Sequence, residues 1–439
     1  MTFFGRLPVI ALLAVGCAGG ASDDTDGPAD DPAALNESEI RLLRQFWPLP
    51  AVPPDPTNAV ADDPWAQHFG RYLFFETRLS TNGEVSCASC HEPTLGWADG
   101  LRQSDTLAPT PRHAPTIVNA SYQRWQFWDG RCDSQWCQAT KPFEDPREMG
   151  SDRVAVVRVV YEDPAMREAY EDLFGTLPDL SDPRFPDHAR PSHANPDDPL
   201  HQAWIAMPPE DRDAIDHAFA NLAKAIAAFE RQIVSRDSAF DRWAEAMLMG
   251  DASGTDLISD EAKIGYKHFV GDGMCMACHS GPTFSNLEFH NVGVGERPWL
   301  DPTDTGRVQG ILSVREDRFN GIGPHSDDPE FGAIKLDYLV ITPEQDGQFK
   351  TPGLRDVFHP PPYNHGGQFE TVEDVIHNYL DQDETPPQGH AEELLKLITM
   401  DEDGIDPLVA FLHTLEGAPI DPELTGPPAD PRYVPDDHQ

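Results

Sequence analysis

The chain contains two copies of one short pattern of cysteine and histidine. Residues 87–91 read Cys-Ala-Ser-Cys-His and residues 275–279 read Cys-Met-Ala-Cys-His. In this pattern the two thiols can add across the vinyl groups of a porphyrin, and the adjacent histidine can then reach the iron. One copy can arise by chance, or can belong to a zinc or redox pair. Two copies predict two covalently bound haem c groups, attached through Cys87, Cys90, Cys275 and Cys278, with His91 and His279 as iron ligands.

Short helices are expected to lead into both motifs. Gly70 and Phe74 precede the first motif, and Gly265 and Phe269 precede the second with the same spacing. Ser259 is a suitable N-cap for the second of these helices. The longest predicted helix lies between the motifs, and its apolar residues recur every three or four positions: Ile215, Phe219, Leu222, Ile226, Phe229 and Ile233. Strand-like alternation is scarce, so the sequence predicts a mainly α fold with two cytochrome c-like domains.

The composition limits the partners. Acidic residues outnumber basic ones by 75 to 32, which gives a formal charge of −43. Coulomb repulsion therefore argues against nucleic acid and anionic lipid surfaces as partners. So much acid is typical of a solvated, salt-tolerant surface, and it would also attract a basic redox partner. The 43 prolines predict long ordered loops rather than disorder, because aromatic and aliphatic residues are still plentiful.

The first seventeen residues are typical of an export signal. They contain one arginine, a short apolar run and small residues that end at Cys17. Residues 14–17 resemble a bacterial lipobox, which would place a lipid on Cys17 after cleavage. Residues 18–36 are acidic and small and suit a flexible tether. We expect a protein on the periplasmic side of the cell envelope, lipid-anchored to the outer membrane, and no second apolar run is long enough to span a membrane.

Cys132 and Cys137 are the two cysteines left without a role. They lie in FWDGRCDSQWCQ, residues 127–138, and form the only intrachain disulfide open to the mature chain. A separation of five residues needs a non-helical backbone to close such a bond. We predict this disulfide, with two free thiols as the alternative.

Five further segments accompany the haem motifs. APTIVN (114–119), FWDGR (127–131) and EMG (148–150) lie between them, and KTPGLR (350–355) and PYNHGG (362–367) follow the second. With these segments, residues 40–416 resemble the bacterial di-haem cytochrome c peroxidase and MauG superfamily. The resemblance implies two haem domains packed face to face. It also implies that the N-terminal haem is the peroxide site and the C-terminal haem the electron relay.

The resemblance assigns three residues to the chemistry. Trp128 matches the tryptophan between the haems, where an indole shortens electron tunnelling. Gln138 matches the distal-pocket glutamine and Glu148 the distal glutamate. A carboxylate there can take the proton from the inner peroxide oxygen and return it to the outer one, so that water leaves. The plainer interpretations are a core aromatic for Trp128 and a helix-entry acid for Glu148.

The sequence departs from the family near the first haem. Many relatives place a histidine on the peroxidatic iron in the resting state, but that position falls near Asp105 and residues 92–112 contain no histidine. We therefore expect an iron that is open without prior reduction, with His113 as the alternative ligand. The family's calcium would bind the carbonyls of Pro360 and Pro362. His113 stands where the family often has a calcium-binding asparagine, which counts against that site.

The second departure concerns the relay haem. Relatives usually supply a methionine as its distal ligand, and the matching position here is Tyr379. Tyr379 shares a predicted helical face with apolar residues, so a core tyrosine is the alternative interpretation. Two other residues near this position are less suitable as ligands. Met400 lies in a later segment, and His377 lies on another face of the predicted helix. An anionic tyrosinate stabilises ferric and ferryl iron and lowers the reduction potential, which favours MauG-like chemistry.

Together these features predict a di-haem cytochrome c peroxidase that reduces hydrogen peroxide with electrons from a small cytochrome c or cupredoxin. The alternatives are MauG-like oxidation of aromatic residues in a partner protein and a non-catalytic electron-transfer cytochrome. Relatives often dimerise, so a homodimer is compatible with the family. We expect an N-terminal haem domain over residues 37–250 and a C-terminal haem domain over 251–417. A Pro-rich tail over 418–439 is expected to pack loosely or not at all.

Overall fold

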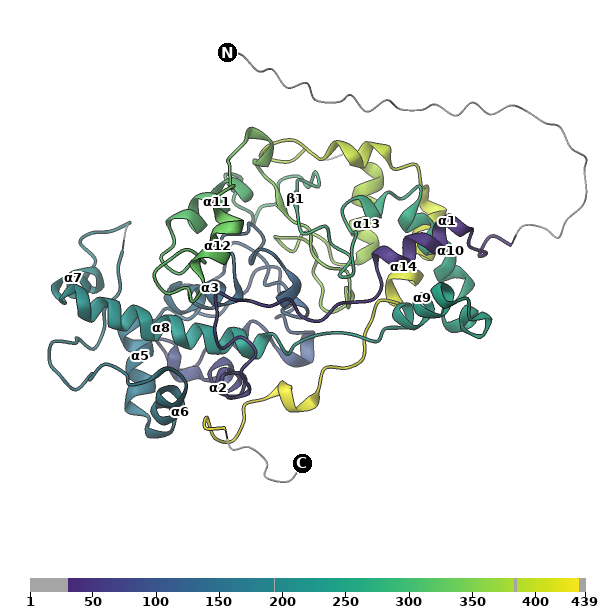
Figure 1. Ribbon diagram of the computed structural model, residues 1–439. Coiled ribbons are helices and arrows are strands. Elements are labelled where there is room, and N and C mark those ends of the chain that lie inside the picture. Colours follow the sequence, from purple (N-terminus) through teal and green to yellow (C-terminus); the bar gives the residue numbers. More distant parts are fainter. Residues whose placement is uncertain (1–30, 193, 383–384, 434–439) are drawn as a thin grey trace, which may run out of the picture.

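The computed structural model describes residues 31–192, 194–382 and 385–433, and this part of the chain is mainly helical, as predicted (Figure 1). The predicted signal peptide, Cys17 and most of the tether lie outside the described residues. The helices are α1 Glu37–Leu42, α2 Pro64–Phe75, α3 Gln135–Ala139, α4 Lys141–Glu144, α5 Arg153–Glu162, α6 Pro164–Phe174, α7 Pro199–Ala206, α8 Pro209–Glu230, α9 Ala239–Met249, α10 Asp260–Val270, α11 Arg307–Glu316, α12 Pro329–Leu336, α13 Val372–Asp381 and α14 Ile405–His413. Two short strands, β1 Phe289–His290 and β2 Phe349–Lys350, pair antiparallel.

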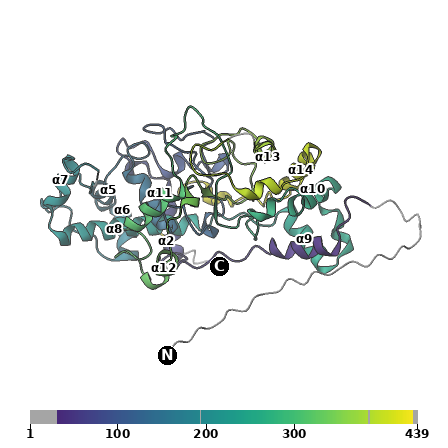
Figure 2. The ribbon, with the colours of Figure 1, turned by 90° about the horizontal axis from the view of Figure 1, so that it is seen from above.

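Two hydrophobic cores organise the helices. The first core surrounds α8 and includes side chains from α2, α3 and α5. The second core surrounds α10 and α14 and includes side chains from α9 and α13. Figure 2 shows α5 to α8 at one end of the molecule and α9, α10 and α14 at the other. The predicted long helix is confirmed as α8, although it ends at Glu230, so that Ile233 is buried just beyond it.

The two helices that lead into the haem motifs cross their neighbours at a glycine. A Cβ on Gly70 of α2 would lie 1.8 Å from the carbonyl oxygen of Ala225 in α8. A Cβ on Gly265 of α10 would lie 1.8 Å from the carbonyl oxygen of Pro407 in α14. Only glycine permits such close backbone approach. The repeated Gly-to-Phe spacing therefore marks the same kind of helix crossing in both halves, and Ser259 caps α10 as predicted.

The N-terminal end of the described chain packs on the second core, and the C-terminal end packs on the first. Near the N-terminus, Leu43 and Phe46 are fully buried in the second core, and the backbone carbonyl of Glu39 in α1 accepts a hydrogen bond from Tyr266 at 2.8 Å. The boundary at residue 250 stays a prediction, but Leu43, Phe46 and residues of α9, all of which precede it, contribute to the second core.

The C-terminal tail returns to the first core (Figure 1). Arg71 of α2 donates to the Glu423 carbonyl at 2.8 Å, and Arg432 pairs with Glu168 of α6 at 2.9 Å. Ile420 also packs against this core. The expectation of a loosely packed tail is therefore wrong for residues up to 433, because polar anchors supplement its few apolar contacts.

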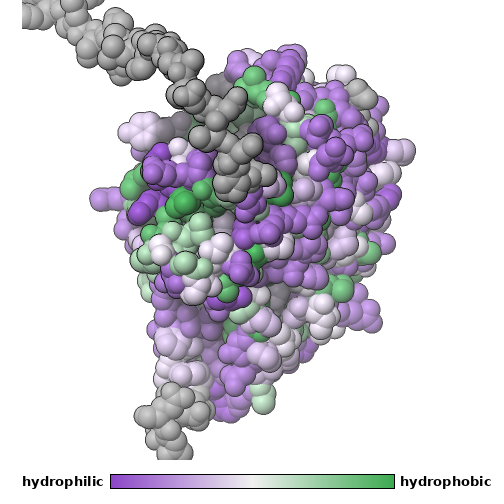
Figure 3. All heavy atoms as spheres, turned by 90° about the vertical axis from the view of Figure 1, so that its right-hand side faces the viewer, coloured by the Kyte–Doolittle hydropathy of each residue, from purple (hydrophilic) through white to green (hydrophobic). Residues whose placement is uncertain are grey.

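The surface reflects the composition. Figure 3 shows the side on which α1, α9 and α10 lie, and it is mostly hydrophilic, with hydrophobic residues in small groups. None of the helices in the described ranges is long and apolar enough to cross a bilayer.

Candidate functional site

A cavity of about 380 Å³ lies beside the first haem motif, and we call it the His91 cavity. The predicted site residues that line it are Cys90, His91, Trp128, Gln138 and Glu148. The Nδ1 atom of His91 lies 3.2 Å from the carbonyl oxygen of Trp97, which leaves Nε2 as the ring nitrogen available to a metal ion. Cys87 begins the short 3-10 turn that leads to Cys90. The structure thus brings the predicted peroxide-site residues together.

A second cavity, of about 270 Å³, lies beside the second motif, and we call it the His279 cavity. The predicted residues that line it are Trp128, Cys275, Cys278, His279, Pro360, Pro362 and Tyr379. The Nδ1 atom of His279 is 2.9 Å from the carbonyl oxygen of Phe284. Burial lowers the pKa of His279 to about 4, which keeps the imidazole neutral, as iron binding requires.

These two cavities suit haem c. Each contains at least one cysteine of its motif and a partly buried histidine whose Nδ1 is held by a backbone carbonyl. Such a second contact fixes the ring orientation and is typical of metal-binding histidines. The residues present therefore fit one covalently bound haem at each motif.

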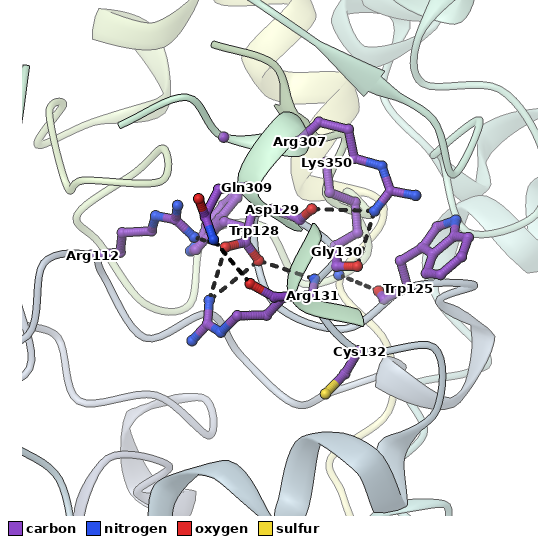
Figure 4. Close-up of polar contacts among 12 residues, drawn as sticks. Arg112, Trp125, Trp128, Asp129, Gly130, Arg131, Cys132, Arg307, Gln309 and Lys350 are labelled. Atoms are coloured by element: carbon purple, nitrogen blue, oxygen red, sulfur yellow. Dashed lines mark hydrogen bonds and ion pairs between the residues drawn. The ribbon is translucent and has the colours of Figure 1, made fainter. Parts of the chain in front are cut away.

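Trp128 lines both cavities and is positioned by a tight turn (Figure 4). Its indole Nε1 donates to the carbonyl oxygen of His113 at 2.9 Å, and its own carbonyl accepts from the backbone N–H of Lys350 at 2.7 Å. Gly130 follows with a φ of +69°, and a Cβ there would lie 2.4 Å from both Arg307 and Phe289. The Asp-Gly turn is therefore required to fix the indole between the cavities.

A buried carboxylate stabilises this turn. Asp129 forms ion pairs with Arg112 at 2.6 Å and Arg131 at 3.2 Å, and Arg112 also pairs with Asp304 at 2.8 Å. Burial alone would raise the pKa of Asp129, but Arg131 and Arg112 hold it below its usual value. Arg307 donates to the Asp129 and Gly130 carbonyls at 3.2 and 2.9 Å (Figure 4).

Gln138 is carried by α3, which is anchored at several points. The structure joins Cys132 to Cys137 in a disulfide with a Cα–Cα distance of 5.6 Å, which ties α3 to the segment after the Trp128 turn. Ser134 caps the helix by accepting from the Cys137 N–H at 3.1 Å. Trp136, for which the sequence suggested no role, is fully buried and donates to Thr57 at 2.9 Å. These contacts fix α3 and so orient Gln138.

Glu148 has the electrostatic environment of an acid–base group. Burial and, to a smaller extent, the charge of Asp145 raise the pKa of Glu148 to about 7, against the opposing effect of Arg131 and Arg147. The carboxyl group therefore changes charge near neutral pH, as proton transfer at neutral pH requires.

The expected ligand Tyr379 and the alternatives His113 and Met400 all line the His279 cavity. His113 lines both cavities, and its Nδ1 lies 2.7 Å from the carbonyl oxygen of Leu101. Tyr379 lies on α13, which Thr371 caps, and burial raises the pKa of its phenol. Met400 also lines the His279 cavity, although the sequence placed it away from the haem.

Two ionisable residues that line the cavities, the partly buried Lys350 and the buried Glu230, have no role in the sequence-based interpretation. Lys350 lines both cavities, donates from Nζ to the Trp125 carbonyl at 3.0 Å, and has its pKa lowered to about 8 by burial. Glu230 ends α8 in the His91 cavity, and burial raises its pKa to about 8, while Gln135 donates to it at 3.2 Å. Lys350 belongs to the KTPGLR segment, so its position in a family motif was the available signal.

Comparison with known proteins identifies the family. Residues 65–248 match the family model described as di-haem cytochrome c peroxidase. The methylamine utilization protein MauG of Methylorubrum extorquens is 30% identical over 418 residues, covering 94% of this chain and 96% of the relative. The cytochrome-c peroxidase IdrP2 of Pseudomonas sp. (strain SCT) is 30% identical over 388 residues, covering 87% and 88%.

Solved structures support the fold. The diheme peroxidase BthA from Burkholderia thailandensis aligns with a TM-score of 0.59 and 20% identity, covering 86% of this chain and 93% of that chain. A MauG-like protein associated with microbial copper homeostasis aligns with a TM-score of 0.56 and 24% identity, covering 87% and 97%. Given the sequence identity to relatives over nearly its whole length, the chain belongs to the di-haem cytochrome c peroxidase family.

Proposed function

We propose that the protein reduces hydrogen peroxide to water with electrons from a small donor protein. One observation carries the proposal. Gln138 and Glu148 line the same cavity as His91, and Trp128 lines this cavity and the His279 cavity. A site for peroxide chemistry and a site for electron entry are thus joined by one indole.

Different residues would act in the two cavities. A haem c attached at each motif would supply iron redox chemistry, with His91 and His279 as ligands. Gln138 would hold peroxide by hydrogen bonds in the His91 cavity. Trp128 would carry electrons between the cavities, and its N–H bond to the His113 carbonyl keeps the indole in one orientation.

Glu148 moves the proton that the reaction requires. Reduction of one hydrogen peroxide takes two electrons from the donor and two protons from water and gives two water molecules. The ionised carboxylate of Glu148 takes the proton from the inner peroxide oxygen and delivers it to the outer oxygen, which departs as water when the O–O bond breaks. Its raised pKa makes both steps accessible near neutral pH.

MauG-like oxidation of a partner protein's aromatic residues is the second candidate. Tyr379 favours it, because Tyr379 lines the His279 cavity where relatives with peroxidase activity usually supply methionine. A non-catalytic di-haem cytochrome is the third candidate, and the acid–base group in the His91 cavity argues against it.

Electron paramagnetic resonance and peroxide titration separate these candidates. One high-spin and one low-spin haem are expected for either enzyme, whereas two low-spin haems in both oxidation states would exclude catalysis. Turnover of peroxide with a reduced donor would support the peroxidase. A long-lived near-infrared band after addition of peroxide to the diferric protein, without donor turnover, would support MauG-like oxidation instead.

Several further features belong to the same proposal. The two haem domains would face each other across Trp128, and a homodimer is compatible with the family. Cys17, outside the described residues, would carry the lipid that holds the protein at the periplasmic side of the outer membrane. Calcium would bind the carbonyls of Pro360 and Pro362, and elemental analysis of the purified holoprotein tests it.

A further inference from the structure

Glu230 is a buried carboxylic acid in the His91 cavity that has no part in the proposed reaction. It is the last residue of α8, which Figure 1 shows running from α7 toward the middle of the molecule. The residue is only 5% exposed, and it lines the cavity beside the first haem motif. A carboxylate in such a place loses its hydration, so it needs either a cation or several hydrogen bonds to stay ionised.

Glu230 has few polar contacts. Gln135, the first residue of α3, donates from Nε2 to the Glu230 carboxylate at 3.2 Å. The adjacent cation, Arg231, donates instead to Asp62 at 2.8 and 3.0 Å. Within the described ranges Glu230 therefore has an amide donor but no ion-pair partner. One such hydrogen bond does not replace the water that a carboxylate loses on burial, so the structure favours the protonated form.

The other charged groups of the cavity have partners of their own. The Nζ atom of Lys350 donates to a backbone carbonyl, and the Nδ1 atoms of His91 and His113 each lie beside one. Burial therefore dominates the pKa of Glu230 and raises it to about 8, against the smaller effect of the hydrogen bond from Gln135. The arginines that line the cavity are each paired with an aspartate: Arg112 and Arg131 with Asp129, Arg147 with Asp145, and Arg355 with Asp241.

Glu230 lies close to the attachment site of the first haem. Its charge raises the pKa of the Cys87 thiol more than the charge of Glu148 does. The crossing of α2 and α8 accounts for this position, because Gly70 of α2 contacts α8 at Ala225, five residues before Glu230, and α2 leads into the motif. A change of charge on a haem held there would act strongly on Glu230, because a buried site screens charges poorly.

We propose that Glu230 is a proton-binding site coupled to reduction of the first haem. When the haem attached at Cys87 and Cys90 gains one electron from an outside donor, the Glu230 carboxylate takes one proton from water, and it releases this proton when the haem is oxidised again. The donor loses the electron, the iron changes from ferric to ferrous, and the net charge of the cavity stays the same. The carboxyl group thus offsets the charge that an electron brings into a buried site. The proposal requires a haem at His91 but no particular one of the candidate reactions.

Potentiometric titration of the holoprotein between pH 6 and 9, without peroxide, tests the proposal. The titration gives one reduction step for each haem. We expect the midpoint potential of one haem to fall as the pH rises through the range in which Glu230 titrates, by up to about 59 mV for each tenfold fall in proton concentration. Glu230→Gln should match the wild type at the acid end of the range, where the carboxyl is protonated. At the alkaline end the variant should keep the higher potential, so that most of the pH dependence is lost.

Two further variants assign the effect to Glu230. Glu148→Gln removes the other glutamate of the cavity and should leave a pH-dependent potential at alkaline pH. Glu210→Gln removes the same charge from the exposed first turn of α8 and should reproduce the wild-type curve. An unchanged curve in Glu230→Gln, or loss of the pH dependence in Glu148→Gln instead, would overturn the proposal.

Infrared spectroscopy observes the proton directly. The difference spectrum between the reduced and the oxidised protein should contain the carbonyl band of a newly protonated carboxyl group, and this band should be absent from Glu230→Gln and present in Glu148→Gln. A band of equal intensity in Glu230→Gln would overturn the proposal.

A second variant decides the question if Glu230→Gln fails to fold. Because the hydrogen bond from Gln135 lowers the pKa of Glu230, Gln135→Leu should move the pH-dependent interval of the potential to higher pH, and an unmoved interval would overturn the proposal. These measurements also separate the proton site from catalysis. A wild-type protein that shows the coupled proton but turns over no peroxide would refute the peroxidase function and leave the role of Glu230 supported.

Discussion

Replacement of Glu148 by Gln tests the acid–base role most directly. Glutamine keeps the size of the side chain but removes the carboxylate. Since burial, together with Asp145, raises the pKa of Glu148 to about 7, the ionised fraction rises from about 10% at pH 6 to about 90% at pH 8. We expect kcat/KM for peroxide to rise about tenfold over this interval. The Gln variant should lose this rise, and its rate at pH 8 should fall by about 10²- to 10⁴-fold.

The assay is the pH dependence of kcat/KM for hydrogen peroxide, measured with a small-molecule donor between pH 5 and 9. Glu162→Gln is the matched control, because the Glu162 side chain is 65% exposed on α5. Arg147→Gln should move the rise to higher pH, since Arg147 lowers the pKa of Glu148. A flat wild-type profile, or a Glu148→Gln variant with an undiminished rate, would refute the role of Glu148.

Stability shows whether a lost rate reflects unfolding. The pKa of Glu148 is raised from 4.5 in an exposed carboxyl to about 7, so the folded state binds its proton more tightly than the unfolded state. That contribution is fully present below about pH 4.5 and is lost as the pH rises through about 7. Glu148→Gln should therefore match the wild type at pH 4 and gain up to about 3 kcal/mol relative to it at pH 8.

Three further perturbations address other parts of the structure. Replacing both Cys132 and Cys137 with serine should lower the free energy of unfolding by about 2 kcal/mol, because the disulfide closes only a short loop. Guanidinium denaturation under oxidising conditions measures this loss, and an unchanged denaturation midpoint would contradict it. Tyr379→Phe should alter the low-spin haem spectrum, and an unchanged spectrum would rule out its ligation. Arg355→Ala should destabilise the fold by about 3–5 kcal/mol, because two nitrogens of Arg355 hold the buried Asp241 carboxylate at 2.8 Å. A melting temperature equal to that of the wild type would contradict this prediction.

The sequence predicted best what depends on local spacing. The repeated Cys-x-x-Cys-His motifs, the cap at Ser259 and the period of α8 each follow from residues within a few positions of one another. The role of Trp136 could not be predicted, because its partner Thr57 lies 79 residues away. Met400 likewise reaches the His279 cavity through tertiary packing that its own segment does not reveal.

Each end of the described chain packs on the core formed mainly by the other half of the sequence, and this has a consequence for unfolding. Phe46, near the N-terminus, is buried in the second core, and Ile420 and Leu424, near the C-terminus, pack against the first. Neither core can open fully without releasing a terminus that the other half holds. Calorimetry should therefore show a single heat-absorption peak for both halves, and the separation between the two cavities should persist until the whole molecule melts.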